Sequence, residues 1–102
     1  MKKPLIVGLT YDLASDYHLE EGDPEDMYGE FDSEETLERL ETAISHLGHS
    51  VFRIGNIEKL VSFLFQRQTV DLVFNIAEGR HGRSRESQVP ALLDAYSIPY
   101  TF

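Results

Sequence analysis

The segment 70-VDLVFNIAEGRHGRSRESQVPALLDAYSIPY-100 carries the pattern that determines the fold class. It begins with a short apolar run at residues 70–74, which is typical of a buried strand. After a glycine-containing loop, apolar residues recur at helical spacing: Val89, Leu92, Leu93 and Tyr96. Residues 98–100 form a second short apolar run. The segment therefore predicts a strand, a helix and another strand.

The same alternation occurs earlier in the chain. Residues 4–10 and 50–54 are short apolar runs with β-branched residues, and each is expected to be a strand. Asp32 or Ser33 can cap a helix that Gly48 ends, and Asn56 can cap the next one. The face of the first of these helices should be Leu37, Leu40, Ile44 and Leu47. The face of the second should be Ile57, Leu60, Val61 and Leu64.

Strands that alternate with helices predict an α/β fold with a parallel sheet. Right-handed crossovers leave few arrangements, and we expect four strands in the order 2-1-3-4. The expected architecture is three-layered and Rossmann-like, with helices on both faces of the sheet. At 102 residues the chain is expected to be a single domain, residues 1–102.

Composition narrows the functional classes. The formal net charge of −9 argues against nucleic acid and anionic membranes as partners. No apolar run approaches the roughly 20 residues that span a bilayer. Because the chain has no cysteine, disulfides and thiolate zinc sites are excluded, and we expect a cytoplasmic location.

Two long loops are expected at one edge of the sheet. Residues 11–32 show no periodicity and carry many of the 18 acidic residues, and residues 75–86 form the second loop. Both follow the carboxyl ends of strands that flank the expected reversal of strand order, where open α/β sheets bind ligands. We therefore expect these two loops to face one another across a single site.

The second loop has features of an anion site. Its glycines allow close approach of the backbone to a ligand, and the following helix begins near residues 84–87 with free N–H groups. Arginine side chains suit a carboxylate or a phosphate. The candidate binding residues are Gly79, Arg83, Ser84, Arg85 and Glu86. The alternative is that the arginines pair with the acidic loop or lie in solvent.

Carboxylates at the same edge could bind an ammonium group. Glu78 follows a buried run, and Glu30 lies in the facing acidic loop. Further candidates at this edge are Tyr11, Asp12, Asn75 and His81. The histidines lack metal-ligand spacing, so no metal is expected, and no dinucleotide-binding or P-loop glycine motif occurs.

The stretch 71-DLVFNIAEGRHGRSRESQVPALLDAYSIPYTF-102 resembles the end of the N-terminal domain of D-alanine–D-alanine ligases and related ATP-grasp enzymes. The family's His-Gly loop, its later glycine, its L-[LM]-[ED] helix end and its I-P-Y motif correspond to four places here. These are Glu78-Gly79, Gly82, Leu92-Leu93-Asp94 and Ile98-Pro99-Tyr100. GEFDS, which contains Glu30, and the later LGHSV also resemble the family.

The resemblance implies an ATP-dependent ligation through an acyl phosphate, as in peptidoglycan biosynthesis, with ATP and Mg bound by the rest of the parent enzyme. Glu30 would help to hold the ammonium group of an amino-acid-like substrate. Glu78 stands where the family has a substrate-facing histidine, and Arg83-Ser84 replaces an acidic pair. These departures indicate a relative whose substrates differ.

The ATP-grasp domains are not in this sequence, so we expect a fragment that carries no catalytic residue, binds no cofactor and is inactive alone. The remaining ATP-grasp domains would be its partners, and exposed apolar surface predicts a homodimer of the isolated chain. The competing interpretation is a stand-alone flavodoxin-like binding or interaction module without catalysis.

Overall fold

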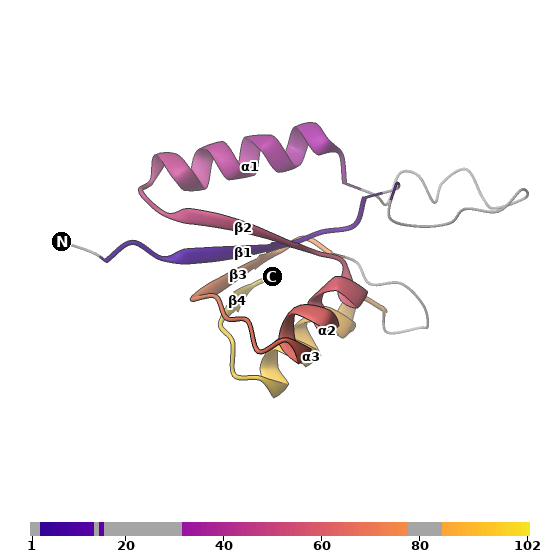
Figure 1. The fold of residues 1–102 in the computed structure, drawn as a ribbon. Helices are drawn as coiled ribbons and strands as arrows, with labels where there is room; N and C mark the ends of the chain where they lie inside the picture. Colours follow the sequence, from indigo (N-terminus) through magenta and orange to yellow (C-terminus); the bar gives the residue numbers. More distant parts are fainter. Residues whose placement is uncertain (1–2, 14, 16–31, 78–84) are drawn as a thin grey trace, which may run out of the picture.

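The computed structural model of this chain describes residues 3–13, 15, 32–77 and 85–102 (Figure 1). Its regular elements alternate along the chain as the sequence predicts. In chain order they are β1 (Ile6–Thr10), α1 (Glu34–His46), β2 (Ser50–Gly55), α2 (Ile57–Phe65), β3 (Leu72–Asn75), the 3-10 turn η3 (Arg85–Ser87), α3 (Gln88–Ala95) and β4 (Tyr100–Thr101). Most of both long loops lies outside the described residues.

The four strands form one parallel sheet in the order β2-β1-β3-β4, which confirms the predicted order. Helix α1 covers one face, while α2 and α3 cover the other (Figure 1). The handedness of crossovers explains this division. The chain crosses the sheet in one direction from β1 to β2, and in the opposite direction from β2 to β3 and on to β4. The helix of the first crossover, α1, is therefore the one that covers its face of the sheet, and α2 and α3 cover the other face. The predicted three-layer, Rossmann-like fold is confirmed.

Helix starts follow the local sequence. The Ser33 side chain caps α1 by accepting a hydrogen bond from the Thr36 N–H at 3.1 Å. Asn56 caps α2 in the same way, because its Oδ1 accepts from the Lys59 N–H at 3.0 Å. Such caps satisfy N–H groups that lack a partner within the helix. Of the two residues proposed for the first cap, Ser33 takes this role.

Three predicted core positions are wrong. Val61 is 51% exposed because the inward face of α2 is centred on Leu60, with Phe63 and Leu64 on either side of it. A neighbouring residue in a helix is turned by about 100° from the inward direction, which leads Val61 to solvent. Leu47 and Tyr96 are exposed because each is the C-cap residue beyond the last turn of its helix.

The two strand boundaries of the 70–100 segment also shift. β3 begins at Leu72, two residues later than predicted, and β4 consists of Tyr100–Thr101 where residues 98–100 were expected. Val70 and Ile98 nevertheless pack against the core on the α2/α3 side. Apolar residues just outside a strand continue the hydrophobic run, which is why the sequence pattern places the boundaries early.

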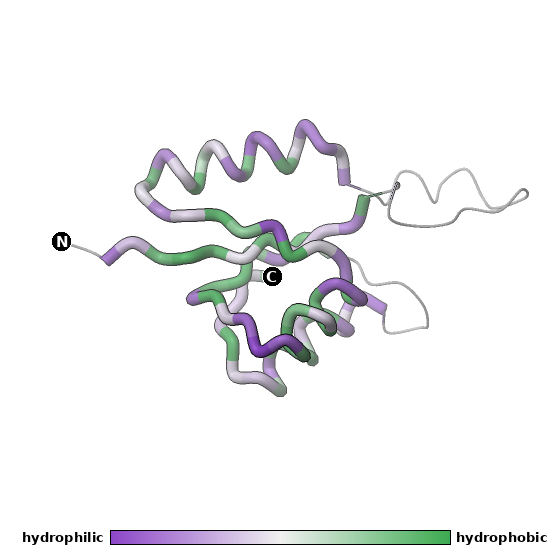
Figure 2. Tube along the Cα trace, viewed as in Figure 1, coloured by the Kyte–Doolittle hydropathy of each residue, from purple (hydrophilic) through white to green (hydrophobic). Residues whose placement is uncertain are grey.

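The core has two parts, one on each face. The α2/α3 side holds the larger cluster, whose buried members are Ile54, Leu60, Phe63, Leu64, Val73, Ala77, Val89 and Leu93. The α1 side holds a smaller one, formed by Leu9, Tyr11 and Leu37. In Figure 2 the central strands are largely hydrophobic, whereas α1 alternates between hydrophilic and hydrophobic residues along its length. Such alternation is typical of a helix that packs on one side only.

An ion-pair cluster attaches α1 to β2. The Arg53 guanidinium donates to Glu41 Oε1 at 2.5 Å and to Glu34 Oε1 at 2.6 Å. The hydrogen bond that Arg53 donates to Glu34 is the largest cause that raises the pKa of Arg53, and desolvation partly opposes it. Both partners lie on α1, so the cluster supplements the small apolar contact on this face.

Candidate functional site

The carboxyl ends of β1 and β3 lie side by side and are joined by side chains. Thr10 and Asn75 are register partners at the ends of these strands, and the Thr10 hydroxyl donates to Asn75 Oδ1 at 2.8 Å. The Ala77 N–H donates to the same oxygen at 3.0 Å. The Ile76 N–H continues the ladder to the Thr10 carbonyl at 2.9 Å. The predicted meeting of these two strand ends is therefore confirmed.

Buried polar side chains gather at this edge. Among the described residues, the buried polar or charged ones are Thr10, Asp12, Asn56 and Asn75. Each is the last residue of a strand or follows a strand end by one or two positions. Polar groups are costly to bury and are retained where structure or ligand binding requires them. This distribution marks the carboxyl edge as the chemically distinct part of the sheet.

The base of the acidic loop is closed by hydrogen bonds. The Asp12 N–H donates to Asp32 Oδ2 at 2.9 Å, and the Asp32 N–H donates to the Asp12 carbonyl at 2.6 Å. Leu13 and Asp32 form an isolated parallel bridge beside them. The chain thus leaves the sheet and returns to α1 at almost one point, next to β1.

The end of β2 is shaped by an irregularity. Thr10 pairs with Gly55 where regular register would place Ile54, and the Tyr11 N–H donates to the Gly55 carbonyl at 2.9 Å. Gly55 has a φ of +109°, a conformation that strongly favours glycine. Bulges of this kind redirect a strand end and are frequent beside binding sites. Here the bulge leads directly to Asn56 and the start of α2.

The described candidates have different surroundings. Tyr11 is buried in the α1-side cluster, so its ring serves packing. Asp12 and Asn75 are 2% and 5% exposed at the edge itself. Arg85 is half-buried and Glu86 is exposed; both lie in η3, which leads into α3 close to the predicted helix start. Their roles as ligand-binding residues stay predictions.

The remaining candidates lie outside the described residues. They are Glu30, Glu78, Gly79, His81, Arg83 and Ser84. The expectation that the two loops face one another concerns largely the same part of the chain. The structure describes the strand ends from which those loops depart and the residues next to both ends of each loop.

Sequence reasoning missed Thr10 as part of this edge, and it assigned Asn56 only a capping role. Both are polar residues that immediately follow apolar stretches, GL before Thr10 and IG before Asn56. Their position at the carboxyl end of an expected strand is a signal that could have identified both residues. The sequence does not predict that they are buried, because burial depends on the neighbouring strand.

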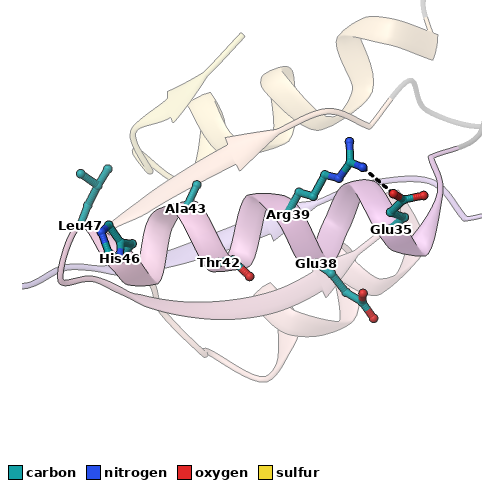
Figure 3. Close-up of a pocket in the computed structure, with 7 residues that line it drawn as sticks. All are labelled: Glu35, Glu38, Arg39, Thr42, Ala43, His46 and Leu47. Atoms are coloured by element: carbon teal, nitrogen blue, oxygen red, sulfur yellow. Dashed lines mark hydrogen bonds and ion pairs between the residues drawn. The ribbon is translucent and has the colours of Figure 1, made fainter.

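Among the described residues, α1 and the ends of α2 and α3 line surface hollows that lie away from this edge. The hollow beside α1, of about 740 Å³, is lined by α1 and its C-cap residue Leu47 (Figure 3). Its lining residues are Glu35, Glu38, Arg39, Thr42, Ala43, His46 and Leu47. Helical spacing places this stripe opposite the buried Leu37, so it is an open outer surface and no enclosed cleft. The smaller hollow, of about 250 Å³, lies between the ends of α2 and α3, beside Arg67 and Tyr96.

Within the described ranges, no group of three or more histidine or carboxylate side chains is arranged to hold a metal ion. In the same part of the chain, no helix has the length and apolar character needed to cross a membrane. Comparison with protein-family models, curated proteins and solved structures found no match. Function has to be inferred from the strand-edge geometry and the sequence motifs.

Proposed function

We propose that this chain is the substrate-side N-terminal domain of an ATP-dependent carboxylate–amine ligase that resembles the D-alanine–D-alanine ligases. The observation that carries the proposal is the Thr10–Asn75 pair, which joins β1 and β3 at the reversal of strand order. Ligands of open α/β sheets bind outside the carboxyl ends of strands at that point. The motifs that resemble the ligase family follow directly from β3.

The proposed substrate is an amino-acid-like small molecule. Glu30 and Glu78 would attract its ammonium group, and Arg83 and Arg85 would attract its carboxylate or an acyl phosphate. ATP and Mg would be bound by the other domains of the parent enzyme, in the cytoplasm, where ATP is available. The chain alone would bind part of the substrate and would not hydrolyse ATP.

Among the described residues, no helix covers the α1 side of β3 and β4 (Figure 1), and this supports the presence of further domains. We define the open half-face as Leu72, Phe74, Thr101 and Phe102, on the α1 side of β3 and β4. Phe102 is 81% exposed although its ring lies 5.5 Å from that of Phe74. Surfaces of this kind usually contact another domain or chain.

The same half-face also favours a second candidate function, a stand-alone interaction module. It is the reason for the proposed homodimer of the isolated chain as well. The reading frame beyond Phe102 distinguishes the ligase domain from the stand-alone module. ATP-grasp sequence there supports the ligase, whereas a stop codon supports the module.

The direct test is ADP release by the protein that contains this chain, with ATP, Mg and single D- or L-amino acids or small dipeptides. We expect release that depends on an amino-acid acceptor and that is lost when Glu78 is replaced by alanine. Glu38→Ala, on the outer surface of α1, is the matched control and should leave activity unchanged. Absence of ADP release with every acceptor would refute the ligase proposal.

A further inference from the structure

The side-chain amide of Asn75 has a fixed orientation. Its Oδ1 accepts hydrogen bonds from the Thr10 hydroxyl and from the Ala77 N–H. A backbone N–H can only donate, so the amide atom that faces Ala77 must be the oxygen. The Nδ2 group is therefore turned away from both partners. Among the described residues, none accepts a hydrogen bond from it.

Within the described part of the chain, the Nδ2 group does not count among the fully buried side-chain atoms that lack a partner. Asn75 as a residue is only 5% exposed, and an unpaired polar atom sealed in the interior is costly. Within the described part of the chain, the fully buried side-chain atom without a partner is the Thr101 hydroxyl, not the Asn75 amide. A nearly buried residue at the end of β3 thus has two N–H donors that are turned away from Thr10 and Ala77.

We propose that the Asn75 Nδ2 group donates a hydrogen bond to a carboxylate oxygen of the bound substrate, and that Thr10 is a positioning residue that holds the amide in this orientation. The proposal rests on the proposed function, because it takes the carboxyl edge as the substrate site. Because the proposed substrate is amino-acid-like, the ligand that fits this edge is a zwitterion rather than a bare anion.

The test follows the Asn75 side-chain NH₂ signal of the ¹⁵N-labelled chain by NMR, with racemic alanine, acetate or methylamine as the added probe. We expect a saturable shift with alanine, a weaker one with acetate and none with methylamine. Backbone signals of Thr10 and Ala77 report binding at the edge independently of the Asn75 side chain.

Asn75→Asp is the informative variant, because it keeps an oxygen for Thr10 and Ala77 but lacks the Nδ2 donor. Its apparent Kd for alanine, read from the Ala77 signal, should rise by about 10-fold or more. Thr10→Val should return the Asn75 NH₂ signal toward that of a free amide and weaken alanine binding, and Thr10→Ser should restore both. Unchanged backbone dispersion shows in each case that the variant is folded.

Two results would overturn the inference. If alanine shifts Thr10 and Ala77 but not the Asn75 NH₂ signal, the ligand binds without Asn75, and the proposed function is untouched. If no signal at this edge responds to any probe, the inference fails as well. The ADP-release assay then decides separately whether the parent is a ligase.

Discussion

The two faces of the sheet are covered very differently. On the α2/α3 side, eight of the described residues form one buried cluster between the sheet and two helices. On the α1 side, three of the described residues form the buried cluster between the sheet and one helix, and the open half-face lies beside it. Both faces are built from the same strands, whose alternate residues are apolar. The difference arises from topology, because right-handed crossovers place one helix on one side and two on the other.

The two faces should differ in whether a substitution affects folding stability or association with another chain. The α2/α3 face is closely packed, so that truncation of a buried side chain there leaves a cavity. The open half-face has half-buried side chains and the exposed Phe102, where a change should alter contact with another domain or copy more than folding. Substitutions on the two faces test this division.

The largest expected effect is on the α2/α3 face. Leu93 is fully buried, so Leu93→Ala should lower the free energy of unfolding by about 2–5 kcal/mol through lost burial and a residual cavity. Leu72→Ala on the half-buried open half-face should cost about 1 kcal/mol. Urea denaturation followed by circular dichroism measures both. Equal costs would mean that the two faces are packed alike.

Gly8 tests how closely the α2/α3 face is packed. A Cβ at this position would lie 2.6 Å from Ile54 Cδ1 and 3.1 Å from Val70 Cγ2. Gly8→Ala should therefore destabilise the fold by about 1–3 kcal/mol. Ile54→Val removes the atom that clashes, so the double variant should be less destabilised than the sum of the single ones. Additive costs in urea denaturation would contradict this account.

Phe102 tests the open half-face. Because it is 81% exposed, Phe102→Ser should change the free energy of unfolding by less than about 0.5 kcal/mol. It should nevertheless reduce the mass of the isolated chain that light scattering reports at high concentration. Phe65→Ser, on the 84% exposed Phe65 of α2, is the matched control and should leave the mass unchanged. A wild-type chain that is monomeric throughout would disprove the proposed homodimer.

The smallest effect concerns Tyr100, which packs against the α2/α3 cluster. Partial burial, and then the hydrogen bond to Asp94 at 3.1 Å and its charge, raise the pKa of the Tyr100 phenol. Since the folded pKa exceeds the unfolded one, the stabilising contribution is complete below about pH 10 and is lost as pH rises through the folded pKa.

Ultraviolet titration of tyrosinate, compared between the wild type and Tyr100→Phe, isolates the Tyr100 pKa. Asp94→Asn should lower this pKa relative to the wild type. An unchanged value would show that Asp94 has no influence on the phenol.

Local signals predicted well, and signals that depend on distant residues did not. The sequence limits the first cap to Asp32 or Ser33 and assigns the second to Asn56, because a cap bonds a backbone group three residues away. Val61 was misplaced because the inward direction of α2 depends on where the sheet lies. Thr10 was missed because its partner Asn75 is 65 residues away, and no sequence pattern links them.

The sequence by itself determined the alternation of strands and helices, and it narrowed the strand order and the helix caps to a few choices. These follow from residue spacing, from crossover handedness and from hydrogen bonds within one turn. Only the tertiary structure decided that Thr10 and Asn75 bond to each other, that polar burial concentrates at the carboxyl edge, and that half of one face stays open. Each of these depends on which residues become neighbours once the sheet has assembled, and that proximity is a property of the packed chain.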